Sequence, residues 1–183
     1  MKKVKREEIL PNEVYAERRT EFRSEVLSLK TSRRVHVGEY LTFLFETTDT
    51  IRYQIQEMLR VEGRSSVEDI DHELKTYNEL LGETGELGCT LLIEIDDVLQ
   101  RDLVLRKWRQ LPRHIYLQLD NGERAMAIYD ERQVGEERLS AVQYLKFDCG
   151  ASVPVGIGLN QPGMEIDVPF SPEQKQALTL DLA

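Results

Sequence analysis

The clearest pattern of apolar and polar positions lies in the stretch YLTFLFETTDTIRYQIQEMLR, residues 40–60. Its first part alternates like a half-buried strand, with one apolar face. That face consists of Leu41, Phe43 and Phe45. Its second part has the stripe of an amphipathic helix over about 50–61, with Asp49 or Thr50 as the N-cap. The stripe consists of Ile51, Ile55, Met58 and Leu59. We therefore expect a strand and a helix that share one apolar core.

Apolar periodicity and capping residues predict four further helices. We expect them at about 13–30, at 67–81, from Asp96 or Asp97 to Leu111, and from Ser171 onward. Ser65 and Glu68 form a capping box for the second, and Ser171 with Gln174 forms one for the last. The helix that ends at Leu111 is apolar on nearly all sides, which predicts that it is deeply buried or covered by a partner.

Alternating apolar residues and turn signals predict the remaining strands. The strongest turn signal is Asn121-Gly122, the preferred dipeptide of a two-residue type I′ hairpin. This loop would place Leu117 opposite Met126 and Ile115 opposite Ile128, with positive φ at both turn residues. Three more strands are expected near 35–37, 89–95 and 153–159, and another at 164–169.

The order of these elements favours a single α+β domain over residues 1–183. We expect an antiparallel or mixed sheet of about seven strands with helices packed on it, because short strands with tight turns dominate the second half. Residues 1–12 form an N-terminal lead-in, and 171–183 form a short C-terminal helix. A length of 183 residues suits one domain of ordinary size.

Composition narrows the class of protein. A hydrophobic fraction of 40% and a charged fraction of 31% are typical of a globular protein. The net charge of −9 disfavours nucleic acid as a partner. Apolar runs fall far short of the roughly 20 residues that span a bilayer, and the basic N-terminus lacks the apolar region of a signal peptide. We therefore expect a cytoplasmic protein without a membrane partner, in which Cys89 and Cys149 are buried free thiols.

No residues show the spacing of a catalytic or metal-binding motif. The three histidines, His36, His72 and His114, are far apart, and there is no Cys-x-x-Cys pair. His72 has acidic neighbours, but the helical wheel places it on a solvated face, and a metal site there would need carboxylates from elsewhere. We therefore name no catalytic residue, metal ligand or cofactor, and keep His72 as the one candidate ligand residue.

The outer face of the predicted helix 50–61 is the candidate partner-binding surface. With the apolar stripe turned inward, four residues share the opposite face, namely Tyr53, Gln56, Glu57 and Arg60. Tyrosine and arginine are over-represented among residues that contribute strongly to binding at interfaces. The alternative is that Glu57 and Arg60, three residues apart, pair with each other on a solvated face.

Four segments, RRVHVGEYLTFLFE, DTIRYQIQEMLR, HELKTYNELL and SAVQYLKF, carry a resemblance to a known family. The chain resembles, over essentially its whole length, the bacterial family called domain of unknown function 3501. The resemblance implies a cytoplasmic protein without an assigned activity, whose gene often lies beside those for rubrerythrin and a cysteine-rich iron–sulfur protein. This association implies a role in redox or oxidative-stress physiology.

Together these features predict an accessory protein that binds a protein partner, with rubrerythrin or the iron–sulfur protein as candidates through the resemblance. Two other functions stay open at this point. One is a small enzyme or ligand-binding module with a pocket near His72 or Cys149. The other is a carboxylate/histidine metal-binding protein.

Overall fold

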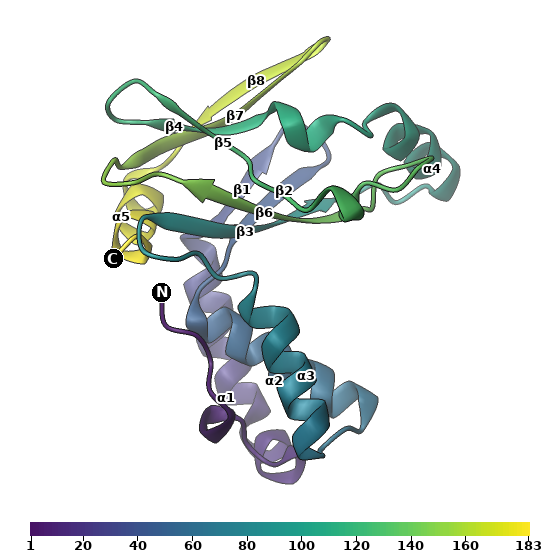
Figure 1. Ribbon diagram of the computed structural model, residues 1–183, viewed down its shortest axis with the longest axis vertical. Coiled ribbons are helices and arrows are strands. Elements are labelled where there is room, and N and C mark those ends of the chain that lie inside the picture. Colours follow the sequence, from purple (N-terminus) through teal and green to yellow (C-terminus); the bar gives the residue numbers. More distant parts are fainter.

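Two antiparallel sheets of four strands each form one part of the molecule, in a computed structural model that describes residues 1–183 (Figure 1). The first sheet has the strand order β1-β2-β3-β6 and the second β5-β4-β7-β8. The strands are β1 (Arg34–Val37), β2 (Leu41–Phe45), β3 (Glu86–Ile93), β4 (Ile115–Leu119), β5 (Arg124–Met126), β6 (Val142–Asp148), β7 (Pro154–Gln161) and β8 (Met164–Pro169).

Three helices form a lobe that projects from the first sheet, and two others lie at the sheets (Figure 1). The lobe contains α1 (Asn12–Thr31), α2 (Thr48–Glu62) and α3 (Val67–Asn78); the other two helices are α4 (Val98–Lys107) and α5 (Pro172–Asp181). Short 3₁₀ helices are η1 (Arg6–Glu8), η2 (Leu111–His114) and η3 (Glu131–Gln133). None of the helices combines the length and apolar character that a membrane crossing requires.

The α+β class is confirmed, but the strands form two sheets instead of one. A core of 24 buried residues lies between the sheets, and both contribute apolar side chains to it. In the first sheet Phe43 pairs with Val35 on one side and Leu91 on the other, and all three enter this core. In the second sheet Leu117 pairs with Ile157, and both enter the same core.

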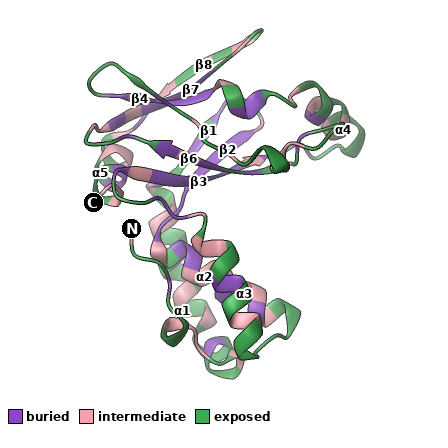
Figure 2. Cartoon of the chain, in the orientation of Figure 1, coloured by how far each residue is buried: buried purple, intermediate pink, exposed green.

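The helical lobe has its own apolar core, so the expectation of one core for β2 and α2 is wrong. Ile51, Ile55 and Leu59 belong to a separate cluster of six buried residues, which also contains Leu74 of α3. Only Glu46 and Thr47 separate β2 from α2, and the helix then runs away from the sheets (Figure 2). Its stripe is therefore covered by α3 and by the N-terminal residues instead of by strands.

Residues 1–12 are part of this lobe and are more than a lead-in. Val4 is buried in the helical core, and its backbone bonds to the side chain of Asn78 at 2.8 and 2.9 Å. The Asn12 side chain donates to the carbonyl of Arg64 at 2.9 Å. These bonds hold the N-terminal segment across the lobe, where η1 lies beside α2.

Capping residues explain where the helices begin. Asp97 and Ser171 cap α4 and α5 as predicted. The N-cap of α2 is Thr47, with Thr50 as its capping-box partner, so the assignment to Asp49 or Thr50 was wrong. The box of α3 is formed by Ser66 and Asp69, one residue later than the predicted pair. In each case a neighbouring residue offers the same oxygen acceptor to the free N–H groups.

The predicted hairpin exists, but its loop and register differ. Tyr116 pairs with Met126 and Leu117 with Ala125, one residue away from the predicted pairing. Only Gly122 has positive φ, at +86°. The Leu119 carbonyl accepts from the Gly122 N–H, and the Leu119 N–H donates to the Glu123 carbonyl, both at 3.0 Å. This is a three-residue loop with a left-handed glycine, which shifts the register relative to a type I′ turn.

Helix α4 is much more exposed than its composition predicts. Leu105 is its one buried residue, whereas Val98, Leu99 and Leu103 are 64%, 77% and 69% exposed. The helix lies at one end of the molecule (Figure 2), and it meets the core through Val104 and Leu105. Of the two alternatives predicted for this helix, deep burial was therefore wrong, and cover by a partner stays a prediction.

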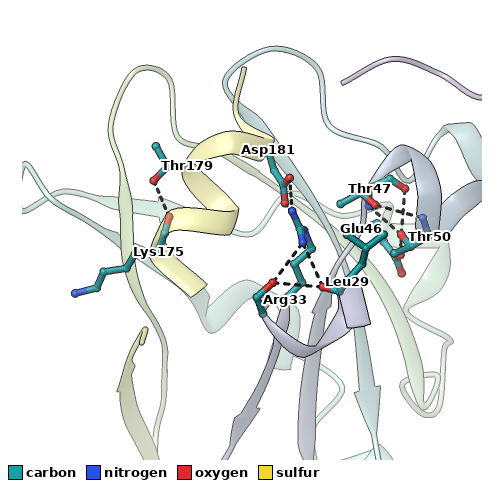
Figure 3. A network of polar contacts seen from close by, with 9 residues as sticks. Leu29, Arg33, Glu46, Thr47, Thr50, Lys175, Thr179 and Asp181 are labelled. Carbon is teal, nitrogen blue, oxygen red and sulfur yellow. Dashed lines mark hydrogen bonds and ion pairs between the residues drawn. The ribbon is translucent and has the colours of Figure 1, made fainter. Parts of the chain in front are cut away.

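The lobe and the sheets are joined by buried polar contacts (Figure 3). Arg33, between α1 and β1, donates to both carboxylate oxygens of Asp181 at 2.7 and 2.9 Å. Glu46, between β2 and α2, accepts from the hydroxyls of Thr50 at 2.6 Å and Thr90 at 2.7 Å. These contacts fix the ends of α1 and α2 to the sheets and to α5.

Candidate functional site

A groove of about 430 Å³ lies between η1, α1 and the first turns of α2. Its volume is within the usual range for a binding site. The groove extends along α1 from Tyr15, in the first turn, to Leu29, near the end of the helix that leads into β1.

Apolar and aromatic side chains from both helices form the floor of the groove. They are Tyr15, Phe22, Val26 and Leu29 of α1 and Tyr53 of α2, with Leu10 from the segment before α1. The rings of Tyr15 and Phe22 are stacked with centroids 5.8 Å apart, and the Arg18 guanidinium lies 4.7 Å from the Phe22 ring centroid. Phe22, Leu29 and Tyr53 are half-buried, so part of this floor is accessible to an apolar group.

Gln56 closes the base of the groove and is 3% exposed. Its amide oxygen accepts from the Leu10 N–H at 2.9 Å, and its amide nitrogen donates to the Leu10 carbonyl at 2.8 Å. This pair of bonds satisfies both polar ends of a buried amide and fixes the N-terminal segment against α2.

Charged side chains line the rim, and acidic groups predominate. The carboxylates are Glu7, Glu8, Glu25 and Asp49, and the guanidiniums are Arg18 and Arg52. Arg52 bonds to Glu8 at 2.9 Å and also pairs with Asp49, while Arg18 bonds to Glu21 at 3.2 Å. Both cations of the rim are therefore engaged by carboxylates of the protein itself.

Behind the groove, Glu57 connects α2 to α1. It accepts from the Tyr15 hydroxyl at 2.7 Å, from Arg19 at 2.8 and 2.9 Å and from Arg60 at 3.2 Å. The bond from Arg19, with those from Tyr15 and Arg60, lowers the pKa of Glu57 to about 2. Burial, followed by the bond to Glu57, raises the pKa of Tyr15. Glu57 is thus a charged anchor between two helices.

The four residues predicted to bind a partner do not all lie at one surface in the structure. Tyr53 and Gln56 line the groove, whereas Glu57 and Arg60 form the paired arrangement that was the alternative interpretation. The expectation that all four share an exposed face is wrong, because α1 packs over α2 and Gln56 is buried. Sequence reasoning did not assign the α1 side of the site, although the stripe that contains Phe22 was visible in the sequence.

The other candidate residues lie apart from this groove. His72 is exposed on α3, and no group of three or more His, Cys, Asp or Glu side chains converges anywhere in the chain to hold a metal ion. A second hollow, of about 340 Å³, lies between α3 and β6, but neither His72 nor Cys149 lines it. His72 and Cys149 themselves line neither of these two hollows, although Thr76, one turn after His72, lines the second.

Both cysteines are buried free thiols, as predicted. Burial raises the pKa of Cys89 well above its ordinary value, and it raises that of Cys149 to about 12. A nucleophilic or redox-sensing thiol needs the opposite shift, because the thiolate is the reactive form. This environment favours a structural role for both residues.

The fold and the groove define an α+β protein with two antiparallel sheets and a helical lobe that carries a half-open apolar site. The chain belongs to the family "Protein of unknown function (DUF3501)", whose sequence profile matches residues 3–182. None of the curated proteins matches the chain. It is similar to a novel protein of unknown function from Burkholderia pseudomallei, known from a crystal structure. That similarity has a TM-score of 0.91 and 30% identity, and it covers 100% of both chains.

Proposed function

We propose that this chain is a non-catalytic accessory protein that binds a protein partner through the groove between α1 and α2. The observation that carries this proposal is the floor of the groove. Phe22 and Tyr53 are half-buried on the two helices that line the groove, so part of each ring stays accessible there. Aromatic residues in a concave, charged-rimmed site are typical of binding surfaces.

The titratable groups at the groove support binding over catalysis. Arg52 is held between Glu8 and Asp49, and Glu57 is held ionised by Arg19 and Arg60. A general acid or base needs a pKa near the working pH, whereas the pKa of Glu57 is shifted away from it, to about 2. These groups hold the walls of the groove in place.

We further propose that the protein acts in the cytoplasm, in a redox or oxidative-stress pathway. The support is the gene association with rubrerythrin and a cysteine-rich iron–sulfur protein that the resemblance implies, which makes these two the first partners to test. The buried thiols imply that this chain would contribute binding rather than its own thiol chemistry.

The test is a titration of purified rubrerythrin and iron–sulfur protein from the native host against wild type, Phe22→Ala and Tyr53→Ala. Tyr40→Ala is the matched control, because Tyr40 is a half-buried tyrosine like Tyr53 and lines neither the groove nor the second hollow. We expect both groove variants to weaken binding by about tenfold or more while the control does not. Groove variants that melt like wild type and bind equally well would refute the proposal.

A further inference from the structure

We propose that the occupant of the groove is a basic amphipathic segment of the partner, with an apolar anchor side chain flanked by lysine or arginine. This inference rests on the function proposed above and names the chemistry of the partner. It follows from the apolar floor of the groove, from its acidic rim and from its two helical walls.

Two polar side chains inside the groove are already paired within the protein. Both ends of the Gln56 amide bond to Leu10, and the Tyr15 hydroxyl bonds to Glu57. What remains open at the floor is the surface of Phe22 and Tyr53. Apart from the Tyr53 hydroxyl, the floor offers a polar ligand group no partner, so a polar group placed against Phe22 would lose its water without compensation and an apolar side chain is favoured.

The charged side chains at the rim that lack a close ion-pair partner are carboxylates. Arg52 and Arg18 are paired with carboxylates of the protein itself. Glu25 is exposed and forms no ion pair, and Glu7 has a single 3.9 Å contact with Lys5 on the surface. Glu7 and Glu25 line the same groove, so a lysine or arginine beside the apolar anchor would meet a free carboxylate.

The negative net charge of the whole chain also favours a cationic partner segment. With a net charge of −9, the protein attracts cationic segments and repels anionic ones over a distance of about 10 Å at moderate salt. An anionic ligand would meet this field and also the acidic rim. The walls are two helices, an arrangement that in other proteins receives an amphipathic helix through anchors on one face.

The first test uses three labelled peptides of about 15 residues, long enough to form a helix. One contains leucine and lysine in an amphipathic pattern, one replaces lysine by glutamate, and one replaces leucine by serine. We expect the leucine–lysine peptide to bind, and the other two to bind about tenfold more weakly or not at all, as measured by fluorescence anisotropy. Equal binding of the serine–lysine peptide would overturn the requirement for an apolar anchor.

Substitutions of the two rim carboxylates test whether the peptide binds in this groove. Glu7→Gln with Glu25→Gln should weaken the leucine–lysine peptide about three- to tenfold and flatten its salt dependence. The matched control is Glu68→Gln with Glu165→Gln, which removes the same charge from exposed positions away from the groove. An equal loss in both double variants would show attraction to net charge only and would overturn the inference.

Failure of this inference can be separated from failure of the proposed function. If Phe22→Ala weakens a natural partner but the Glu7/Glu25 variant does not, and the leucine–lysine peptide does not compete, the groove binds a partner of different chemistry. If Phe22→Ala leaves the partner unaffected as well, both proposals fail.

Discussion

Replacing Glu57 by glutamine tests whether the charged anchor between α1 and α2 stabilises the lobe. The substitution keeps the size of the side chain and removes the charge that Tyr15, Arg19 and Arg60 bind. We expect a folded protein that is less stable than wild type at neutral pH, because hydrogen bonds to a charged acceptor are stronger than those to an amide.

The pKa of Glu57 sets an upper limit on this effect. A shift from the ordinary 4.5 to about 2 corresponds to about 3 kcal/mol at neutral pH. Glu57 is 16% exposed, but Arg19 and Arg60 are 35% and 33% exposed, and solvent screens part of the attraction. Glutamine also keeps weak hydrogen bonds to the same donors. We therefore expect a loss of about 1–2 kcal/mol.

The sign of the pH dependence follows from the lowered pKa. The stabilisation by Glu57 is fully present above its unfolded pKa of 4.5 and is lost as the pH falls through its folded pKa of about 2. Urea unfolding at neutral pH should show a midpoint lowered by about 0.5–1 M, and the difference between variant and wild type should shrink below about pH 4.5.

The control is Glu21→Gln, which breaks the exposed pair with Arg18 and should change stability by less than about 0.5 kcal/mol. If Glu57→Gln matches wild type at neutral pH, or if its deficit is unchanged in acid, the ion-pair network does not stabilise the lobe as argued.

Four further predictions concern other parts of the molecule. Cys89 and Cys149 should react with a thiol reagent only on unfolding, because both are buried; rapid reaction of both in the native protein would contradict this. Arg33→Ala should lower the free energy of unfolding by about 1–3 kcal/mol, since it leaves the Asp181 carboxylate, which is only 10% exposed, without its partner; a melting curve like that of wild type would argue against the contact. Gly122→Ala should cost about 1 kcal/mol in denaturant unfolding, because φ is +86° while an added Cβ meets open space, and no loss would mean that another loop forms. Purified protein should contain no stoichiometric metal by elemental analysis, because no three ligands converge, and one equivalent of iron or zinc would contradict this.

Local sequence patterns predicted most helices and strands but not how their faces meet. Periodicity showed the apolar faces of β2 and α2, and both elements formed. It could not show that these faces enter different cores, because any apolar surface of suitable shape can cover an apolar stripe. The loop type and register of the hairpin were mispredicted for a similar reason. A glycine after asparagine suits both a type I′ turn and the three-residue loop that formed.

The sequence predicted the α2 side of the candidate site but not its α1 side. Tyr53 and Gln56 were selected from the side of α2 opposite its apolar stripe, and both line the groove. The other half required the packing of α1 and of residues 1–12, which depends on contacts distant in sequence such as that between Gln56 and Leu10. No local pattern reports such a contact.

The hairpin of β1 and β2 has a consequence for the rates at which the groove can bind. Helix α1 leads into β1 and β2 leads into α2, so the two walls continue the strands of one hairpin, paired from Arg34 with Leu44 to Val37 with Leu41. Moving α1 away from α2 would also break the bonds that Glu57 accepts from Tyr15 and Arg19. The width of the groove is therefore set before a ligand arrives. We expect association in a single kinetic phase, at the roughly 10⁵–10⁷ M⁻¹s⁻¹ of preformed sites, with differences between ligands expressed in their dissociation rates.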